Sequence, residues 1–324
     1  MSHMVETMAY AYKKGSNTEA YQVPWHGLGT PIEPGISVRE MLKVSGLDWK
    51  VERHPTFARI DGREVYTGKD VLARNTDGKI LTHVSEGWNE VQNEMFAHFF
   101  EEFVEAGHME MNTMGSLNDG KMVWALAKVG ESFELFKGRD KVEAYLLFSN
   151  PHQYGKCVDI RFTAIRAVCK NTLTLALNTN AENDMMVRLN HSRAFDPEQV
   201  KEALGISSDR LATYREAAEF LVSKSFSEET LNEFLTEVFP SQSKNEDEVK
   251  LSRPHKLALE HLDTQPGADL GRGTWWHAFN TVTFVTDHLQ GRSEDTRLAS
   301  AWYGPNRTRK VNALEKAVEF ANAA

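Results

Sequence analysis

Apolar and polar residues alternate with a period of two along several stretches of the first half of the chain. The clearest case is residues 157–164, where every second position is apolar. The apolar positions are Val158, Ile160, Phe162 and Ala164, and the polar ones are Asp159, Arg161 and Thr163. This period is typical of a β-strand that packs one face and solvates the other. We therefore expect one face of this strand to lie in the core and the other to face water.

Two Asp-Gly pairs divide the region before this strand into hairpins. Asp61-Gly62 separates residues 49–61 from residues 63–76, and Asp77-Gly78 separates the latter from residues 79–85. An Asp-Gly pair between alternating runs is a strong hairpin signal. An amphipathic pattern then predicts a helix over residues 94–106, capped by Asn93. The unit is three antiparallel strands followed by one helix.

The remaining elements follow from the same patterns. We expect further strands at residues 109–116, 121–129, 143–149 and 187–191, and a short helix at residues 171–177. From Asp196-Pro197 onward the spacing is helical, and helices are predicted at residues 197–224, 228–238, 252–262, 275–289 and 307–323. Ser227 and Thr274 are expected to cap two of them.

These elements predict an α+β fold: a twisted antiparallel sheet built from β-β-β-α type units, with a helical carboxyl-terminal third. We expect a flexible amino terminus over residues 1–22, whose first four residues (MSHM) look like a cloning remnant. An antiparallel α+β domain should cover residues 23–194. A helical region, residues 195–324, should pack on or beside the sheet.

Composition narrows the class of protein. No apolar run approaches membrane-spanning length and no secretory signal is visible, so we expect a cytoplasmic protein without a membrane partner. Cys157 and Cys169 are the only cysteines, and we expect both to be reduced. The formal net charge is −9. Residues 153–193 nevertheless carry a net positive charge.

Six basic residues in that region are the predicted binding site. They are Lys156, Arg161, Arg166, Lys170, Arg188 and Arg193. Cations that line one groove bind phosphates through charge and released counterions, without base contacts. The alternative is that these side chains form ordinary salt bridges with acids of the helical third. The sequence leaves both interpretations open.

Two other charged segments are candidates for binding. Residues 302–305 (WYGP), followed by Arg307, Arg309 and Lys310, form a second small basic segment at a helix start, where a phosphate or a partner subunit could bind. Residues 227–248 carry seven acids against Lys244 alone. This acidic stretch is either a contact face or the solvated side of ordinary helices.

The sequence predicts no catalytic residue, no metal site and no cofactor. His26 lies in a loop that is rich in glycine and proline. Its residues Trp25, His26, Gly27 and Gly29 are expected to have a structural or a functional role. No nucleophile, base or acid accompanies His26 nearby in the sequence. The other histidines are scattered rather than placed at ligand spacing, and Gly27-Leu28-Gly29 lacks the remaining parts of a phosphate loop.

Three phrases together resemble one known family. They are PWHGLGTPI (Pro24 to Ile32), SEGWNEVQN (Ser85 to Asn93) and IRAVCKNTLTLAL (Ile165 to Leu177), and the likeness extends to AFNTVTFVTDH (Ala278 to His288) and WYG (Trp302 to Gly304). The chain is similar to the phage/plasmid-like protein family, also called domain of unknown function 932. The resemblance implies a phage or plasmid protein that works in replication, recombination or defence against the host, in the bacterial cytoplasm. The three strands and helix also look like the core unit of ring-forming single-strand annealing proteins, a likeness of fold only.

The leading hypothesis is a non-enzymatic, homo-oligomeric protein that binds single-stranded DNA and promotes strand annealing or recombination. An alternative is a protein-interaction module that modulates a host factor through the acidic helices. A third hypothesis is an enzyme that acts on nucleic acid or nucleotides.

Overall fold

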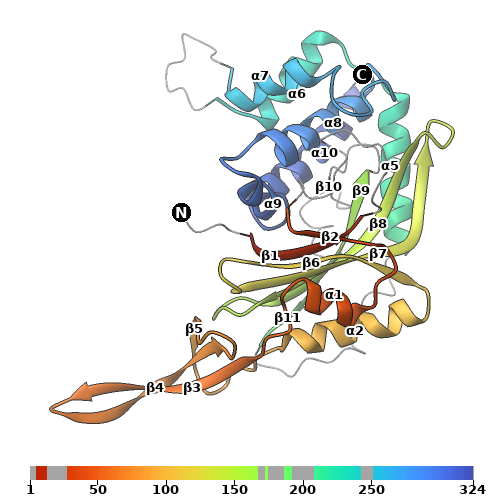
Figure 1. Cartoon of the computed structure of the whole chain (residues 1–324). Coiled ribbons are helices and arrows are strands. Elements are labelled where there is room, and N and C mark those ends of the chain that lie inside the picture. The colour runs from red at the N-terminus through yellow and green to blue at the C-terminus, as the bar shows by residue number, and fades with distance from the viewer. Residues whose placement is uncertain are drawn as a thin grey trace.

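The structure is a computed structural model that describes residues 5–12, 28–166, 172–173, 186–191, 208–241 and 251–323. It contains two β-sheets and a helical carboxyl-terminal region, which confirms the α+β class (Figure 1). The large sheet has eight strands in the order β10-β9-β8-β7-β6-β1-β2, with β11 paired to β9. Among the described pairings of this sheet, β1 and β2 are parallel and all the others are antiparallel. The small sheet has the order β3-β4-β5.

The strands have the following bounds: β1 (Val5–Ala11), β2 (Thr30–Ile32), β3 (Val51–Ile60), β4 (Arg63–Arg74), β5 (Ile80–Val84), β6 (Met109–Leu117), β7 (Met122–Leu135), β8 (Asp140–Pro151), β9 (Val158–Arg166), β10 (Thr172–Leu173) and β11 (Met186–Leu189). The helices are α1 (Val38–Val44), α2 (Asn93–Glu105), α5 (Ser208–Ser223), α6 (Glu228–Val238), α7 (Arg253–His261), α8 (Trp275–Phe284), the π-helical η3 (Val285–Leu289), α9 (Glu294–Tyr303) and α10 (Pro305–Ala323). None of the helices in the described part of the chain is both long and apolar enough to cross a membrane.

Local sequence signals placed most of these elements correctly. The β3–β4 turn has Asp61 at φ 48° and Gly62 at φ 79°, the two positive angles that a tight Asp-Gly hairpin turn requires. Ser227 caps α6 with a reciprocal capping box, and Thr274 caps α8. The predicted unit of three strands and a helix is confirmed as β3, β4, β5 and α2, although Gln92 rather than Asn93 is the residue before α2.

Three expectations about elements are wrong, and one helix was not expected. The amino terminus is not loose over Val5–Ala11, because β1 pairs with both β6 and β2 and buries Met8, Ala9 and Tyr10. The predicted helix at residues 171–177 is contradicted at Thr172–Leu173, which pair with β9 as a strand, and its other positions lie outside the described residues. Helix α9 was not predicted. The second face of β9 is covered rather than wet.

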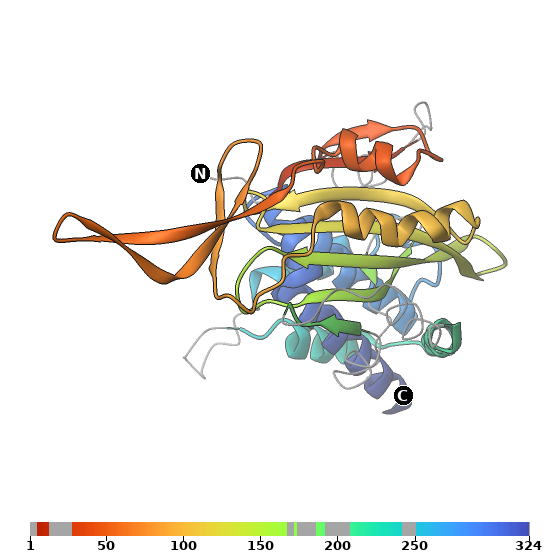
Figure 2. The ribbon, with the colours of Figure 1, turned by 90° about the horizontal axis from the view of Figure 1, so that it is seen from below.

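Helices cover both faces of the large sheet, which explains this last difference. On one face, α1 and α2 pack over β6 and β8 through residues such as Met41, Phe99 and Phe148 (Figure 2). On the opposite face, Trp302 of α9 packs among Trp124, Tyr145 and Ile165. A third cluster joins α5, α6, α8 and α10 to the ends of β7 and β8. The polar side chains of β9 therefore lie beneath a helical layer.

Candidate functional site

The structure describes five of the ten residues in the predicted site and loop. Lys170, Arg193, Trp25, His26 and Gly27 lie outside the described residues. Gly29 is described and has a φ of +84°. A Cβ atom there would lie 2.4 Å from the backbone oxygen of Met8, so this loop position needs glycine to pack against β1.

Lys156 and Arg188 are exposed, whereas Arg161 and Arg166 are buried. Lys156 lies in the β8–β9 loop, just before the first residue of β9, and Arg166 is the last residue of that strand. The two side chains are therefore at opposite ends of β9. The described basic residues do not line one groove.

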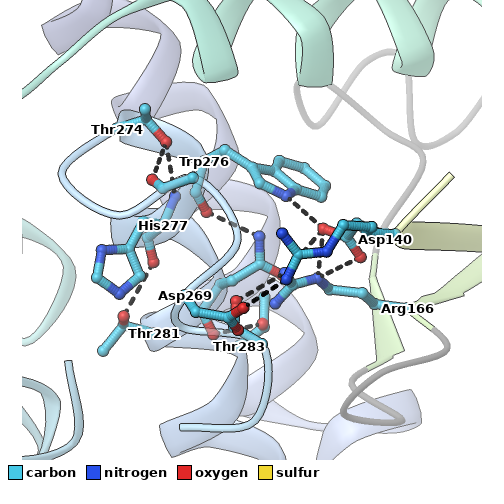
Figure 3. A network of polar contacts seen from close by, with 12 residues as sticks. Asp140, Arg166, Asp269, Thr274, Trp276, His277, Thr281 and Thr283 are labelled. Carbon is cyan, nitrogen blue, oxygen red and sulfur yellow. Dashed lines mark hydrogen bonds and ion pairs between the residues drawn. The ribbon is translucent and has the colours of Figure 1, made fainter. Parts of the chain in front are cut away.

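Arg166 lies in the interior, where its charge is balanced by a carboxylate. Its Nε and Nη2 atoms donate to Asp140 at 2.9 and 2.7 Å, and the indole nitrogen of Trp276 donates to the same carboxylate at 3.1 Å (Figure 3). The Arg166 and Asp140 side chains are 1% and 0% exposed. A side chain this buried cannot contact a phosphate from solvent. Arg166 therefore forms a salt bridge between β8 and β9 instead of acting as the predicted phosphate ligand.

Arg161 takes part in a second, less buried arrangement. Its Nη2 donates to Asp159 at 2.7 Å, and its Nη1 donates to the backbone oxygen of Trp302 at 3.4 Å. The guanidinium lies 5.7 Å from the ring centre of Tyr303, and the Tyr303 hydroxyl forms a 2.8 Å hydrogen bond with Ser149. Burial raises the pKa of the Tyr303 hydroxyl, which therefore stays neutral. Arg161 thus links β9 to the end of α9.

Two basic segments that are distant in the sequence meet at this point. Arg188 lies directly across from Asp159 in the β11–β9 register, so both side chains lie on the same face as Arg161. Arg307, in the first turn of α10, interacts electrostatically with both Arg161 and Asp159. Arg161, Arg188 and Arg307, gathered at Asp159, form what we term the arginine cluster.

Burial and the nearby charge of Arg161 lower the pKa of Arg307 to about 10. A lowered arginine pKa means that the site destabilises the cation, because positive charge is crowded and partly removed from water. An anion placed there would relieve this repulsion.

An exposed aromatic group, Tyr154, lies in the loop between β8 and β9. Tyr154, whose side chain is 59% exposed, lies 5.5 Å from Trp88, and Trp88 stacks on His191 at 4.1 Å between ring centres. His191 follows Arg188 by three residues, roughly 10 Å of extended chain. Exposed aromatic side chains are usual components of a single-strand binding surface.

The sequence had assigned Arg307 to a separate basic segment, apart from the six predicted site residues. No local signal could have joined Arg307 to Arg161 and Asp159, because only the packing of the α9–α10 junction on β9 brings them together.

Taken together, the fold and this cluster define an antiparallel α+β protein with three arginines around one aspartate on its large sheet. A family model described as Domain of unknown function (DUF932) matches residues 80–316, which is most of the chain. The protein belongs to that family. Comparisons with curated proteins and with solved structures return no match.

Proposed function

We propose that the protein is a non-enzymatic, self-associating single-stranded-DNA-binding protein of a phage or another mobile element, and that it promotes strand annealing or recombination. The observation that carries the proposal is the convergence of Arg188 and Arg307 on Arg161 and Asp159. Three arginines gather at one aspartate among the described residues. Such a surface attracts phosphates even though the whole chain has a net charge of −9.

In this proposal Arg188 and Arg307 contact the DNA backbone, and Arg161 holds the surface in place. Arg161 is suited to that role because it is already engaged by Asp159 and Trp302. A base stacks on the exposed ring of Tyr154. Stacking accepts every base, so binding should be independent of sequence.

The first test is the binding of a labelled single-stranded oligonucleotide across a salt series, with a duplex of the same sequence alongside. We expect the wild-type protein to prefer the single strand and to lose affinity as salt rises. The double variant Arg188→Gln/Arg307→Gln should bind more weakly, and its salt slope should fall by about 0.7 for each phosphate contact removed. Tyr154→Ala should lose about 1–3 kcal/mol with an unchanged salt slope, because stacking releases no counterions.

The matched control is Arg215→Gln/Arg272→Gln, which removes the same charge from two exposed ion pairs elsewhere. This control should bind as the wild type does. The proposal is overturned if the wild-type protein does not bind the single strand at low salt. It is also overturned if the Arg188/Arg307 variant keeps the full wild-type affinity. Annealing itself is measured as faster pairing of two complementary labelled strands.

A second candidate function is a protein-interaction module that modulates a host factor. Helix α6 exposes Glu228, Glu229 and Glu233, a row of acids that a basic partner could contact. Co-purification of a host protein with the wild type, lost when these acids are changed to glutamine, would favour this candidate.

A further inference from the structure

The β3–β4 hairpin extends beyond the rest of the small sheet. Strand β5 pairs with β4 only from Asp70 to Ala73, so residues 56–69 form a ribbon of two strands without a third. We call residues 56–69 the distal arm. Figure 2 shows it projecting away from the body of the molecule.

Both faces of the distal arm carry exposed apolar side chains. Phe57 and Tyr66 are cross-strand neighbours whose rings meet edge to face at 6.0 Å, and they are 54% and 48% exposed. Because side chains alternate along a strand, Ile60 and Val65 lie on the other face, 55% and 47% exposed. Four of the eight large apolar side chains found exposed in the described residues are therefore on this short ribbon.

An isolated two-stranded ribbon is marginally stable in water, and a concentration of exposed apolar surface marks an interaction site. The direction of the arm is nevertheless fixed. The Tyr66 hydroxyl donates to Asp70 at 3.0 Å, and Arg53 donates to the same carboxylate at 3.1 Å and to Glu90 at 3.0 Å. The arm is thus pre-organised for a partner that would bury its exposed apolar side chains.

The partner is expected to contact the faces of the arm rather than its edge. Strand β3 carries Pro55, which has no N–H to donate, and its pairing with β4 is interrupted by a bulge between Pro55 and Phe57. Proline and bulges are the devices that prevent a strand edge from adding another strand. A groove that takes up the ribbon would cover both apolar faces.

The same chain has such a groove between α1 and α2. Its volume is about 820 Å³, and Leu42, Leu47, Trp49, Met95 and Ala97 supply its apolar lining. Its charged lining residues are three bases and three acids: Arg39, Lys43, Lys50, Asp48, Glu94 and Glu101. A lining with equal numbers of both signs suits a protein segment better than a phosphate polymer.

We propose that the distal arm of one copy docks in the α1–α2 groove of a second copy of this chain. The arm projects away from α1 and α2 of its own chain, so the contact is made between chains (Figure 2). Charge favours this occupant: the distal arm has three bases and two acids, so its net charge is opposite in sign to the −9 of the chain that it would meet. Asp61 at its tip and Glu64 disfavour a nucleic acid in the same place.

The proposal deepens the self-association that the proposed function includes and rests on it, but it does not depend on DNA binding. The experiment is therefore carried out on the full chain without DNA, so that a failure of assembly is distinguishable from a failure of DNA binding. Mass in solution is measured by light scattering over a concentration series.

We expect the wild type to form oligomers. The arm variant Phe57→Ser/Ile60→Ser and the groove variant Met95→Arg should each be monomeric, with unchanged circular dichroism. Ile80→Ser is the matched control, because Ile80 is 53% exposed and lies outside both surfaces, and it should keep the wild-type mass. A mixture of the arm and groove variants should form dimers and nothing larger, because only one intact arm and one intact groove can meet.

A wild type that stays monomeric at every concentration would overturn the proposal. So would an arm variant that keeps the wild-type mass. Monomeric variants whose mixture does not form dimers would show that the arm docks elsewhere, which also overturns it.

Discussion

We expect Asp140→Asn to lower the free energy of unfolding by about 3–5 kcal/mol, because it removes the charge that balances the buried Arg166 guanidinium. The two side chains are 1% and 0% exposed, so water cannot replace the lost carboxylate. Asp140 also accepts from Trp276 of α8, and Arg166 donates to the backbone oxygen of Gly267 at 3.2 Å. The change should therefore weaken the attachment of the helical region to the sheet. Urea titration followed by tryptophan fluorescence measures the loss.

Two controls separate the buried charge from a general effect of substitution. Asp269→Asn removes one partner of an exposed ion pair with Arg139, whose side chains are 64% and 68% exposed, and should cost less than about 1 kcal/mol. The double variant Asp140→Leu/Arg166→Met replaces both charges with apolar groups and should recover most of the stability. If Asp140→Asn were as stable as Asp269→Asn, the pair would not be a structural support of the fold.

The elements that the sequence predicted correctly depend on neighbours in the chain. Asp61-Gly62 specifies its turn because both residues tolerate positive φ, and Ser227 caps α6 through an N–H three residues away. Strand β1 gave no such signal. Its place in the sheet depends on Met8 and Tyr10 packing against β6 and α9, which are far away in the sequence.

The alternation along β9 predicted which side chains share a face, but not what covers that face. Arg161 does point away from Val158 and Ile160, yet the surface it meets belongs to Trp302 and Tyr303. Of the two interpretations that the sequence left open, the salt bridge is the one seen for Arg161 and Arg166, although both acids, Asp159 and Asp140, belong to the sheet. The binding role of the arginine cluster remains a proposal.

Acid should act on the fold through a buried histidine at the junction of α2 and β8. His152 Nε2 lies 3.0 Å from Asn93 Oδ1. The Asn93 amide nitrogen donates to the backbone oxygen of Leu47 at 3.0 Å, so Oδ1 accepts and His152 is neutral with its proton on Nε2. Burial, with a smaller contribution from His191, lowers the pKa of His152 from 6.5 to about 3.

We expect the wild type to lose about 1.4 kcal/mol of unfolding free energy per pH unit from this group as the pH falls below 6.5 towards about 3. In this window the unfolded chain binds a proton at His152 that the folded chain excludes, so protons favour unfolding. His152→Gln keeps a donor for Asn93 and removes the titrating group. The slope of unfolding free energy against pH should therefore fall by the amount that corresponds to about one bound proton. His83→Gln, which removes an exposed histidine, should leave the slope unchanged. Urea titrations at a series of pH values measure the slopes, and an unaltered slope in His152→Gln would rule out this linkage.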